Sequence, residues 1–193
     1  MYLRTFFAIV LVCFLAFSCR TGEPDEQTAA KLTEQGWESF TLGGYQAALR
    51  KFLEAIRANP EYVDAYNGTG WTYAKLNNLD SSKIQFTTGL NKDPNNLEIK
   101  AGLSFVYNAQ KDYDFSNDLA LQVADSDSNW SFRRDTTITV DDLRLLIAEN
   151  YFAIGNYSAS LAQVKILNPG FDADVTTAEG QAALAHEIER LRT

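Results

Sequence analysis

The sequence is poor in cysteine, histidine and proline, and each shortage excludes a class of protein. Its 193 residues include two cysteines, one histidine and four prolines. Two thiols and one imidazole are too few for the cysteine- and histidine-rich sites that hold zinc, so no metal site is expected. Four prolines and eleven glycines exclude collagen-like and low-complexity chains. What remains is a globular chain, 46% hydrophobic and long enough for one domain or two small ones.

Positive charge is also scarce, because 17 Lys and Arg stand against 25 Asp and Glu and leave a formal net charge of −8. Binding to nucleic acids requires cations that neutralise phosphates, so no nucleic-acid partner is expected. The lone His186 is not accompanied by a nucleophile motif, and no strand leads into a glycine-rich phosphate loop. We therefore expect no enzyme activity, no cofactor and no small-molecule substrate.

The longest apolar segment is an uninterrupted run of twelve residues from Phe6 to Phe17, preceded by the charged residue Arg4. A helix that spans a bilayer needs about 20 apolar residues, so this run is too short for one. A short apolar run after a basic residue is typical of a secretory signal peptide. We therefore predict a signal peptide over residues 1–18.

The end of this segment predicts how the signal is processed. Ala16 and Ser18 supply the small side chains that favour cleavage before Cys19. The segment 15–19, LAFSC, resembles a bacterial lipoprotein signal. The resemblance implies that Cys19 becomes a lipid-modified N-terminus. A secreted protein without lipid and an uncleaved membrane anchor are the alternatives.

Lipidation of Cys19 would anchor the mature chain in a bacterial cell envelope, with the outer membrane favoured and its periplasmic or surface face left open. Cleavage would also remove Cys13, so that the mature chain could form no internal disulfide. The polar, acidic residues that follow predict a linker, so residues 19–27 are assigned to the lipidated cysteine and linker. Residues 28–193 are assigned to the folded domain.

A 34-residue period runs through the first half of this domain. Four pairs of identical residues have this spacing: Gly36 and Gly70, Trp37 and Trp71, Phe52 and Phe86, Pro60 and Pro94. The period and the pattern Ala48-x3-Phe52 with Pro60 resemble the tetratricopeptide repeat (TPR) family over residues 29–62 and 63–96. The resemblance implies an all-α fold, a right-handed superhelix of helix pairs that bury their faces against their neighbours.

The repeated residues have physical roles in such a fold. Glycine inside a helix costs about 1 kcal/mol relative to alanine, which is tolerable where a second helix crosses closely. We therefore expect Gly36 and Gly70 at helix crossings, with Phe52 filling the space between successive pairs. Pro60 cannot continue a helix and is expected to end the second helix of its pair.

Two further copies, 97–130 and 141–169, are degenerate. The first has Ser104 at the glycine position, and a polar loop over residues 125–138 separates it from the second. Thr139 precedes three residues that match a capping box, which predicts a helix start. Residues 176–191 have one apolar face and are expected to form a C-terminal capping helix. The complete pattern predicts nine helices.

The TPR resemblance also places a binding surface. In that family the first helix of each pair lines a concave groove that binds protein segments. The positions that would face this groove are Trp37, Phe40, Asn67, Trp71, Phe105, Asn108 and Phe152. Acidic residues flank them and the family's cationic carboxylate clamp is absent, so a basic or aromatic segment is favoured over an acidic peptide. The alternative is that the rings pack against a neighbouring helix or the polar loop.

The polar loop itself offers two patterns of low specificity. Its start at Asp125 resembles a calcium-binding loop, but Trp130 and Thr136 stand where glycine and glutamate are required, so a solvated loop is predicted. Arg133 and Arg134 are expected to be a surface pair, with contact to lipid headgroups or a partner as the alternative.

These patterns predict a membrane-anchored, non-enzymatic protein-interaction module that binds a protein or peptide segment in its concave groove. The alternative is a structural subunit of an outer-membrane or envelope assembly. Such a subunit would bind through its convex face or through the 125–138 loop.

Overall fold

The computed structural model describes residues 24–192. The predicted signal, Cys19 and most of the predicted linker therefore lie outside the described residues. Within the described range the fold is all-α, as predicted, and its only extended pairing is a single bridge between Ser131 and Thr139. Nine helices follow one another along residues 24–192: α1 (Glu26–Thr41), α2 (Tyr45–Ala58), α3 (Val63–Lys75), α4 (Leu79–Lys92), α5 (Leu97–Ala109), α6 (Tyr113–Ser126), α7 (Val140–Ala153), α8 (Tyr157–Leu167) and α9 (Ala178–Leu191).

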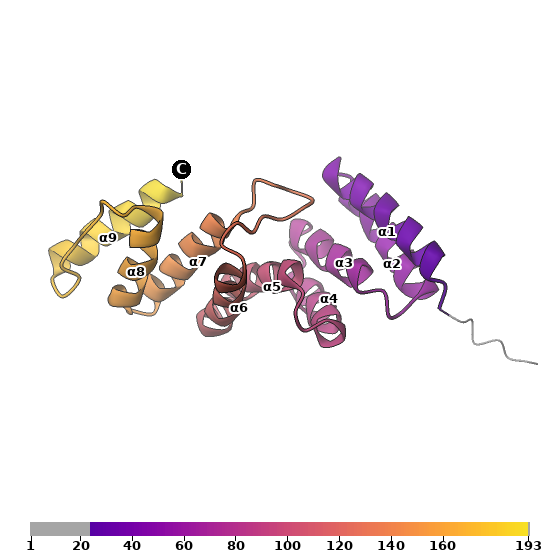
Figure 1. The fold of residues 1–193 in the computed structure, drawn as a ribbon, viewed down its shortest axis with the longest axis horizontal. Helices are drawn as coiled ribbons and strands as arrows, with labels where there is room; N and C mark the ends of the chain where they lie inside the picture. Colours follow the sequence, from indigo (N-terminus) through magenta and orange to yellow (C-terminus); the bar gives the residue numbers. More distant parts are fainter. Residues whose placement is uncertain (1–23, 193) are drawn as a thin grey trace, which may run out of the picture.

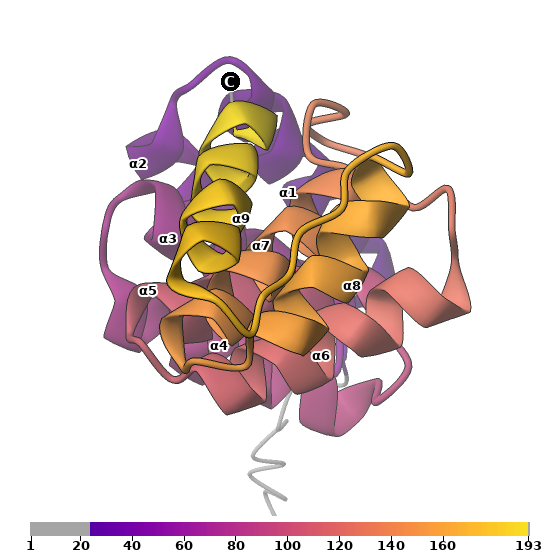
Figure 2. The ribbon, with the colours of Figure 1, turned by 90° about the vertical axis from the view of Figure 1, so that its left-hand side faces the viewer.

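The helices form four stacked pairs and a terminal helix (Figure 1). α1 packs on α2, α3 on α4, α5 on α6 and α7 on α8, and the second helix of each pair packs on the first helix of the next. Only the first helices also contact one another directly, α1 with α3, α3 with α5 and α5 with α7. They therefore form the inner, concave layer of the arc. α9 lies against α7 and α8 and closes the C-terminal end (Figure 2).

Phenylalanine rings occupy the helix crossings that the glycines leave open. A Cβ atom added to Gly36 would lie 2.6 Å from the Phe52 ring, and one added to Gly70 would lie 2.5 Å from the Phe86 ring. Such distances leave no room for any side chain. The predicted crossing role of both glycines is therefore confirmed.

The period is also visible in the backbone after each first helix. Gly43, Asn77 and Lys111 have positive φ values of 75°, 57° and 62° and are spaced 34 residues apart. The next such residue, Gly155 with φ 79°, comes 44 residues after Lys111. The chain therefore contains ten additional residues before the fourth turn, nine in the connection between α6 and α7 and one in α7, which is one residue longer than α5.

A buried serine hydrogen bond links the two helices in the last three pairs. In each pair a serine in the second helix donates its hydroxyl to a backbone carbonyl twelve residues earlier, in the first helix. The bonds join Ser82 to Gly70, Ser116 to Ser104 and Ser160 to Ala148 at 2.8, 2.9 and 2.7 Å. The degenerate copies thus keep the contact that holds the pair together although they lack the glycine.

The helix starts also follow from local chemistry. The backbone N–H and hydroxyl of Thr139 donate to Asp142 Oδ2 at 2.7 and 2.8 Å, so the predicted capping box is confirmed. α9 begins at Ala178, two residues later than expected, because Thr177 is its N-cap and accepts a bond from the Gly180 N–H at 3.0 Å.

Candidate functional site

The connection between α6 and α7, residues 127–139, folds back as a hairpin; we call it the insertion loop. The Phe132 N–H donates to the Ile138 carbonyl at 2.9 Å, and the Val140 N–H donates to the Trp130 carbonyl at 2.8 Å. Helix α6 continues to Ser126, so the predicted loop boundary at Asp125 is wrong by two residues. Figure 1 shows the hairpin extending across the hollow side of the arc toward α3 and α1.

The Phe132 side chain is fully buried between the first two helix pairs. Its ring stacks on Trp71 of α3, with the centroids 4.3 Å apart and an interplanar angle of 17°. It meets Trp37 of α1 edge to face at 5.9 Å and Phe40 at 6.4 Å. Aromatic rings favour both arrangements. The insertion loop therefore inserts one ring into an aromatic cluster built by α1 and α3, the first helices of the first two repeats.

Arg133 of the insertion loop pairs with an acidic network on the concave face. Its Nε donates to Glu98 Oε1 at 2.6 Å, and its guanidinium lies 3.9 Å from Asp64 Oδ1. Asn67 donates to both carboxylates, and Asp64 accepts a further bond from the Trp37 indole at 2.9 Å. The bond to Glu98 raises the pKa of Arg133 above its ordinary value, so this cation stays charged.

Arg134 makes the longest-range ion pair of the site. Its guanidinium donates two hydrogen bonds to the Glu34 carboxylate, at 3.1 and 3.0 Å, across 100 residues of sequence. The same group lies over the Trp37 ring, 5.1 Å from its centroid, in a cation–π contact. The bonds from Arg134 lower the pKa of Glu34. Contacts from α1, α3 and α5 thus fix three consecutive residues of the loop.

Polar atoms at this contact are less well satisfied than the rings. Among the described residues, five buried side-chain atoms have no hydrogen-bond partner. Four of these atoms belong to the concave side of α1 and α3 or to the insertion loop. These are Thr33 Oγ1, Asn67 Oδ1, Trp71 Nε1 and Arg134 Nε. A buried unpaired polar group costs about 1–3 kcal/mol. The loop therefore fills the apolar part of this surface better than its polar part.

The structure corrects the expectation of an open aromatic groove. Trp37, Phe40 and Trp71 lie on the concave layer as expected, but they are buried because Phe132 covers them. Asn67 is also buried, in the acidic network beneath Arg133. The alternative, in which the rings pack against the polar loop, describes this part of the molecule. Recognition of a partner by these residues stays a prediction.

The remaining predicted residues differ in position. Phe105 is half-buried beside Trp71, with a centroid distance of 6.2 Å. Asn108 donates to Asn150 at 2.6 Å and so joins α5 to α7. Phe152 packs on Tyr157 in a separate cluster at the C-terminal end. The site therefore contains Phe105 but not Phe152, while Asn108 serves the packing between repeats.

Sequence reasoning missed the occupant of the site. Arg133 and Arg134 are not a free surface pair, since both are bound to carboxylates on other helices. Phe132 and Glu34 were not singled out at all. The available signal was complementarity, because an aromatic residue followed by two arginines matches an acidic, aromatic surface. Such a match becomes evident only when residues 100 positions apart are brought together.

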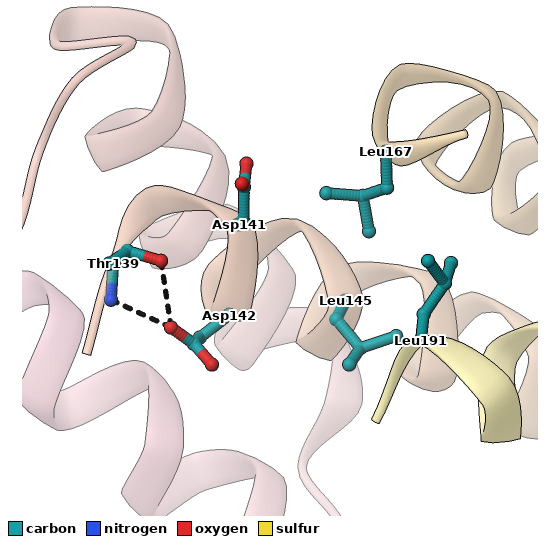
Figure 3. Close-up of a pocket in the computed structure, with 6 residues that line it drawn as sticks. All are labelled: Thr139, Asp141, Asp142, Leu145, Leu167 and Leu191. Carbon is teal, nitrogen blue, oxygen red and sulfur yellow. Dashed lines mark hydrogen bonds between the residues drawn. The ribbon is translucent and has the colours of Figure 1, made fainter. Parts of the chain in front are cut away.

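A second hollow lies at the C-terminal end of the array (Figure 3). It is a recess of about 210 Å³ with Leu145, Leu167 and Leu191 on one side, contributed by α7, α8 and α9. Asp141 and Asp142 lie at its edge, and Asp142 is already bonded to Thr139. This recess is open and carries no aromatic side chain.

Two absences concern the part of the chain that the structure describes. Between residues 24 and 192, no helix combines the length and apolar character needed to cross a bilayer. Over the same residues, no group of three or more His, Cys, Asp or Glu side chains is arranged to hold a metal ion. His186 is exposed on α9.

The stacked pairs, the glycine crossings and the concave first helices define a tetratricopeptide-like helical-repeat fold. No protein-family model matches the chain. Anaphase-promoting complex subunit 3 of Schizosaccharomyces pombe is 30% identical over 81 residues, which are 42% of this chain and 12% of that protein. The match thus spans only a small part of that relative.

Solved structures support the same fold. A crystal structure of MamA superposes with a TM-score of 0.65 at 14% identity, covering 86% of this chain and 88% of MamA. PilF of Pseudomonas aeruginosa has a TM-score of 0.61 at 16% identity, covering 84% of this chain and 68% of PilF. The first TPR of Spaghetti (RPAP3), solved with the HSP90 peptide SRMEEVD, has a TM-score of 0.59 at 14% identity over 68% of this chain and 96% of its own.

Proposed function

We propose that this chain is a non-enzymatic interaction module that binds a segment of another protein along its concave face. The observation that carries the proposal is the packing of the Phe132 ring among Trp37, Phe40 and Trp71. Two arginine–carboxylate pairs flank this ring. The concave face already binds the insertion loop of its own chain. The contacts, a stacked ring and two arginine–carboxylate pairs, are of the kind found at protein–protein interfaces. Aromatic residues and arginine are the residues enriched at binding hot spots.

Charge argues for a basic or aromatic partner segment. The peptide in the Spaghetti structure, SRMEEVD, ends in an acidic stretch. The present concave face carries Glu34, Asp64 and Glu98, which would repel such a peptide and attract cations. The proposed partner therefore differs in sign from that ligand.

We also propose that lipid on Cys19 anchors the module in a bacterial cell envelope, with the outer membrane favoured. The support is the resemblance of residues 15–19 to a lipoprotein signal and the short apolar run before it. A lipid chain gains membrane affinity through its buried methylenes, at about 0.8 kcal/mol each. The anchor would hold the concave face close to partners in or on that membrane.

Site-specific photo-crosslinking in native membranes tests the binding surface. One crosslinker replaces Lys75, at the end of α3, where it faces Asp135 of the insertion loop at 3.6 Å. The matched control replaces Ile84, exposed on the outer helix α4. We expect a specific product from position 75 that is lost in the Glu34→Lys background. Products from position 84 alone would contradict binding at the concave face.

Binding through the convex face, in a structural subunit of an envelope assembly, is the second candidate. It is favoured by two exposed apolar side chains on outer helices, Ile84 of α4 at 61% and Phe115 of α6 at 58% exposure. The crosslink from position 84 that would contradict the first candidate would support this one.

A further inference from the structure

We propose that the insertion loop is an intramolecular stand-in for the partner. The partner segment would present an aromatic side chain followed by two cations and would displace Phe132, Arg133 and Arg134 from the same contacts. This inference rests on the function proposed above and specifies both the partner chemistry and the regulation of that site.

The insertion loop is not needed to stack the helices. The connections that lead into α3 and α5 have four residues each, whereas the connection into α7 has thirteen. Nevertheless α6 packs on α7 just as α2 packs on α3. The additional residues make their side-chain contacts with α1, α3 and α5 instead. The additional residues therefore bind the concave face as a covalently attached ligand would.

The contacts of the insertion loop are of a kind that a separate chain can make. They consist of one ring in an aromatic cluster and two guanidinium groups on carboxylates. None of them requires the hairpin backbone. A segment with the same three side chains in the same order offers the same interactions. The loop sequence therefore indicates the chemistry of the partner segment.

An extended segment would also satisfy atoms that the hairpin does not. The hairpin bonds its own backbone, since Phe132 donates to Ile138 and Asp135 donates to the Phe132 carbonyl. Asn67 Oδ1 and Trp71 Nε1 have no partners among the described residues. An extended chain carries free N–H and C=O groups that can pair with this acceptor and this donor. Buried polar groups strongly favour such pairing, which gives an incoming segment an advantage over the loop.

Parts of the insertion loop are exposed to solvent, which favours its release from the concave face. Thr136 and Thr137 at its tip are exposed, and Arg133 is 66% exposed although its carboxylate partner is buried. A ligand that competes with an attached occupant binds with an affinity reduced by the fraction of molecules that are open. The loop would therefore set the threshold at which a partner binds.

A peptide copied from the chain tests this competition. The probe is a fluorescent peptide with the sequence of residues 129–137, NWSFRRDTT, titrated into the full chain in detergent and followed by anisotropy. The opened variant carries Phe132→Ala with Arg134→Ala. We expect it to bind the peptide roughly tenfold more tightly than the wild-type chain, or better. A peptide with alanine in place of its phenylalanine should bind neither protein, and Glu34→Lys in the opened background should weaken binding.

A second variant guards against misfolding of the first. Arg133→Glu with Arg134→Glu leaves Phe132 in place but repels the loop from the acidic face, and circular dichroism verifies the helices of both variants. Equal peptide affinity for wild-type and opened chains would overturn the displacement. No binding to either opened variant with intact helices would overturn the partner chemistry. The crosslink from position 75 would still report on the proposed function by itself, so the two failures are distinguishable.

Discussion

Phe132 stacks on Trp71 with its ring centroid 4.3 Å away, although 61 residues separate them in the chain. This contact places a segment from between the third and fourth repeats onto the concave side of the second. It explains why the aromatic residues of α1 and α3 are buried in a fold whose first helices would otherwise leave them exposed.

Truncation of Phe132 should loosen the loop and uncover the tryptophans. We expect Phe132→Ala to lower the free energy of unfolding by about 3 kcal/mol, the lower end for a buried phenylalanine, because the loop can move away rather than leave a closed cavity. Tryptophan emission should shift to longer wavelength as Trp37 and Trp71 meet water. Denaturant titration and fluorescence measure both effects. Phe115→Ala, at an exposed ring, is the control, and equal losses from the two variants would be incompatible with the burial of Phe132.

The crossing glycines should tolerate no side chain. Gly70→Ala would place a methyl group 2.5 Å from the Phe86 ring, and we expect a loss of about 2 kcal/mol by overpacking. Gly170→Ala is the matched control, because its Cβ would meet only an Asn168 side-chain atom at 3.6 Å. Thermal melts followed by circular dichroism should show a lower midpoint for the first variant alone. Similar midpoints for both variants would contradict the close crossing.

A gain of stability is expected where the repeat holds a strained residue. Lys111 has a φ of 62°, in the left-handed region that costs residues other than glycine roughly 1–2 kcal/mol. Lys111→Gly should therefore raise the unfolding midpoint by about 2–4 °C, as expected for about 1 kcal/mol in a chain of this size. Asn77→Gly should gain less, since asparagine tolerates this conformation. A lower midpoint for Lys111→Gly would refute the strain.

Acid should weaken the C-terminal end through Glu187. Hydrogen bonds from Arg190 and Asn168 lower the pKa of Glu187 from 4.5 to about 2. Because the folded pKa is the lower one, the carboxylate stabilises the fold fully above pH 4.5, and this contribution disappears as the pH falls toward about 2. The stability difference between wild type and Glu187→Gln should shrink over that range. A constant difference between wild type and Glu187→Gln across that range would exclude the linkage.

The anchor makes a prediction about fractionation. Cys19→Ser should move the chain from the membrane pellet to the supernatant of lysed cells, because the site of lipid attachment is lost. Cys13→Ser is the control, since this residue lies in the segment expected to be removed. Membrane recovery of both variants in equal amounts would speak against lipid at Cys19.

The sequence was sufficient for the fold because the contacts that define it recur at fixed spacing. Gly70 and Phe86 lie within one repeat, so the pattern that reports their contact is local and repeated. The capping box at Thr139 is likewise contained in four residues. The degenerate pairs were harder to recognise, because Ser104 stands at the glycine position, although Ser116 keeps the serine bond that Ser82 makes in the preceding pair.

The state of the concave face could not be predicted in the same way. Its key pairs, Phe132 with Trp71 and Arg134 with Glu34, join an insertion that has no counterpart in the other repeats to helices far away in sequence. The period break indicated additional residues but not where they go. The sequence does predict a basic or aromatic partner segment, from the acidic residues at the groove and the absence of the family's cationic clamp, and the insertion loop has this chemistry.

The two ends of the insertion loop meet at the hydrogen bond from Val140 to Trp130, 2.8 Å long, directly beside the stacked helices. A segment inserted beyond this bond would leave the two ends of the loop in place beside α6 and α7. Exchanging the tip for another sequence would change the segment that the loop presents to the concave face, while the stacked helices stay unchanged. In such a design the inserted sequence and the surface that binds it would belong to the same chain. An external ligand could then be detected by its competition with the attached segment.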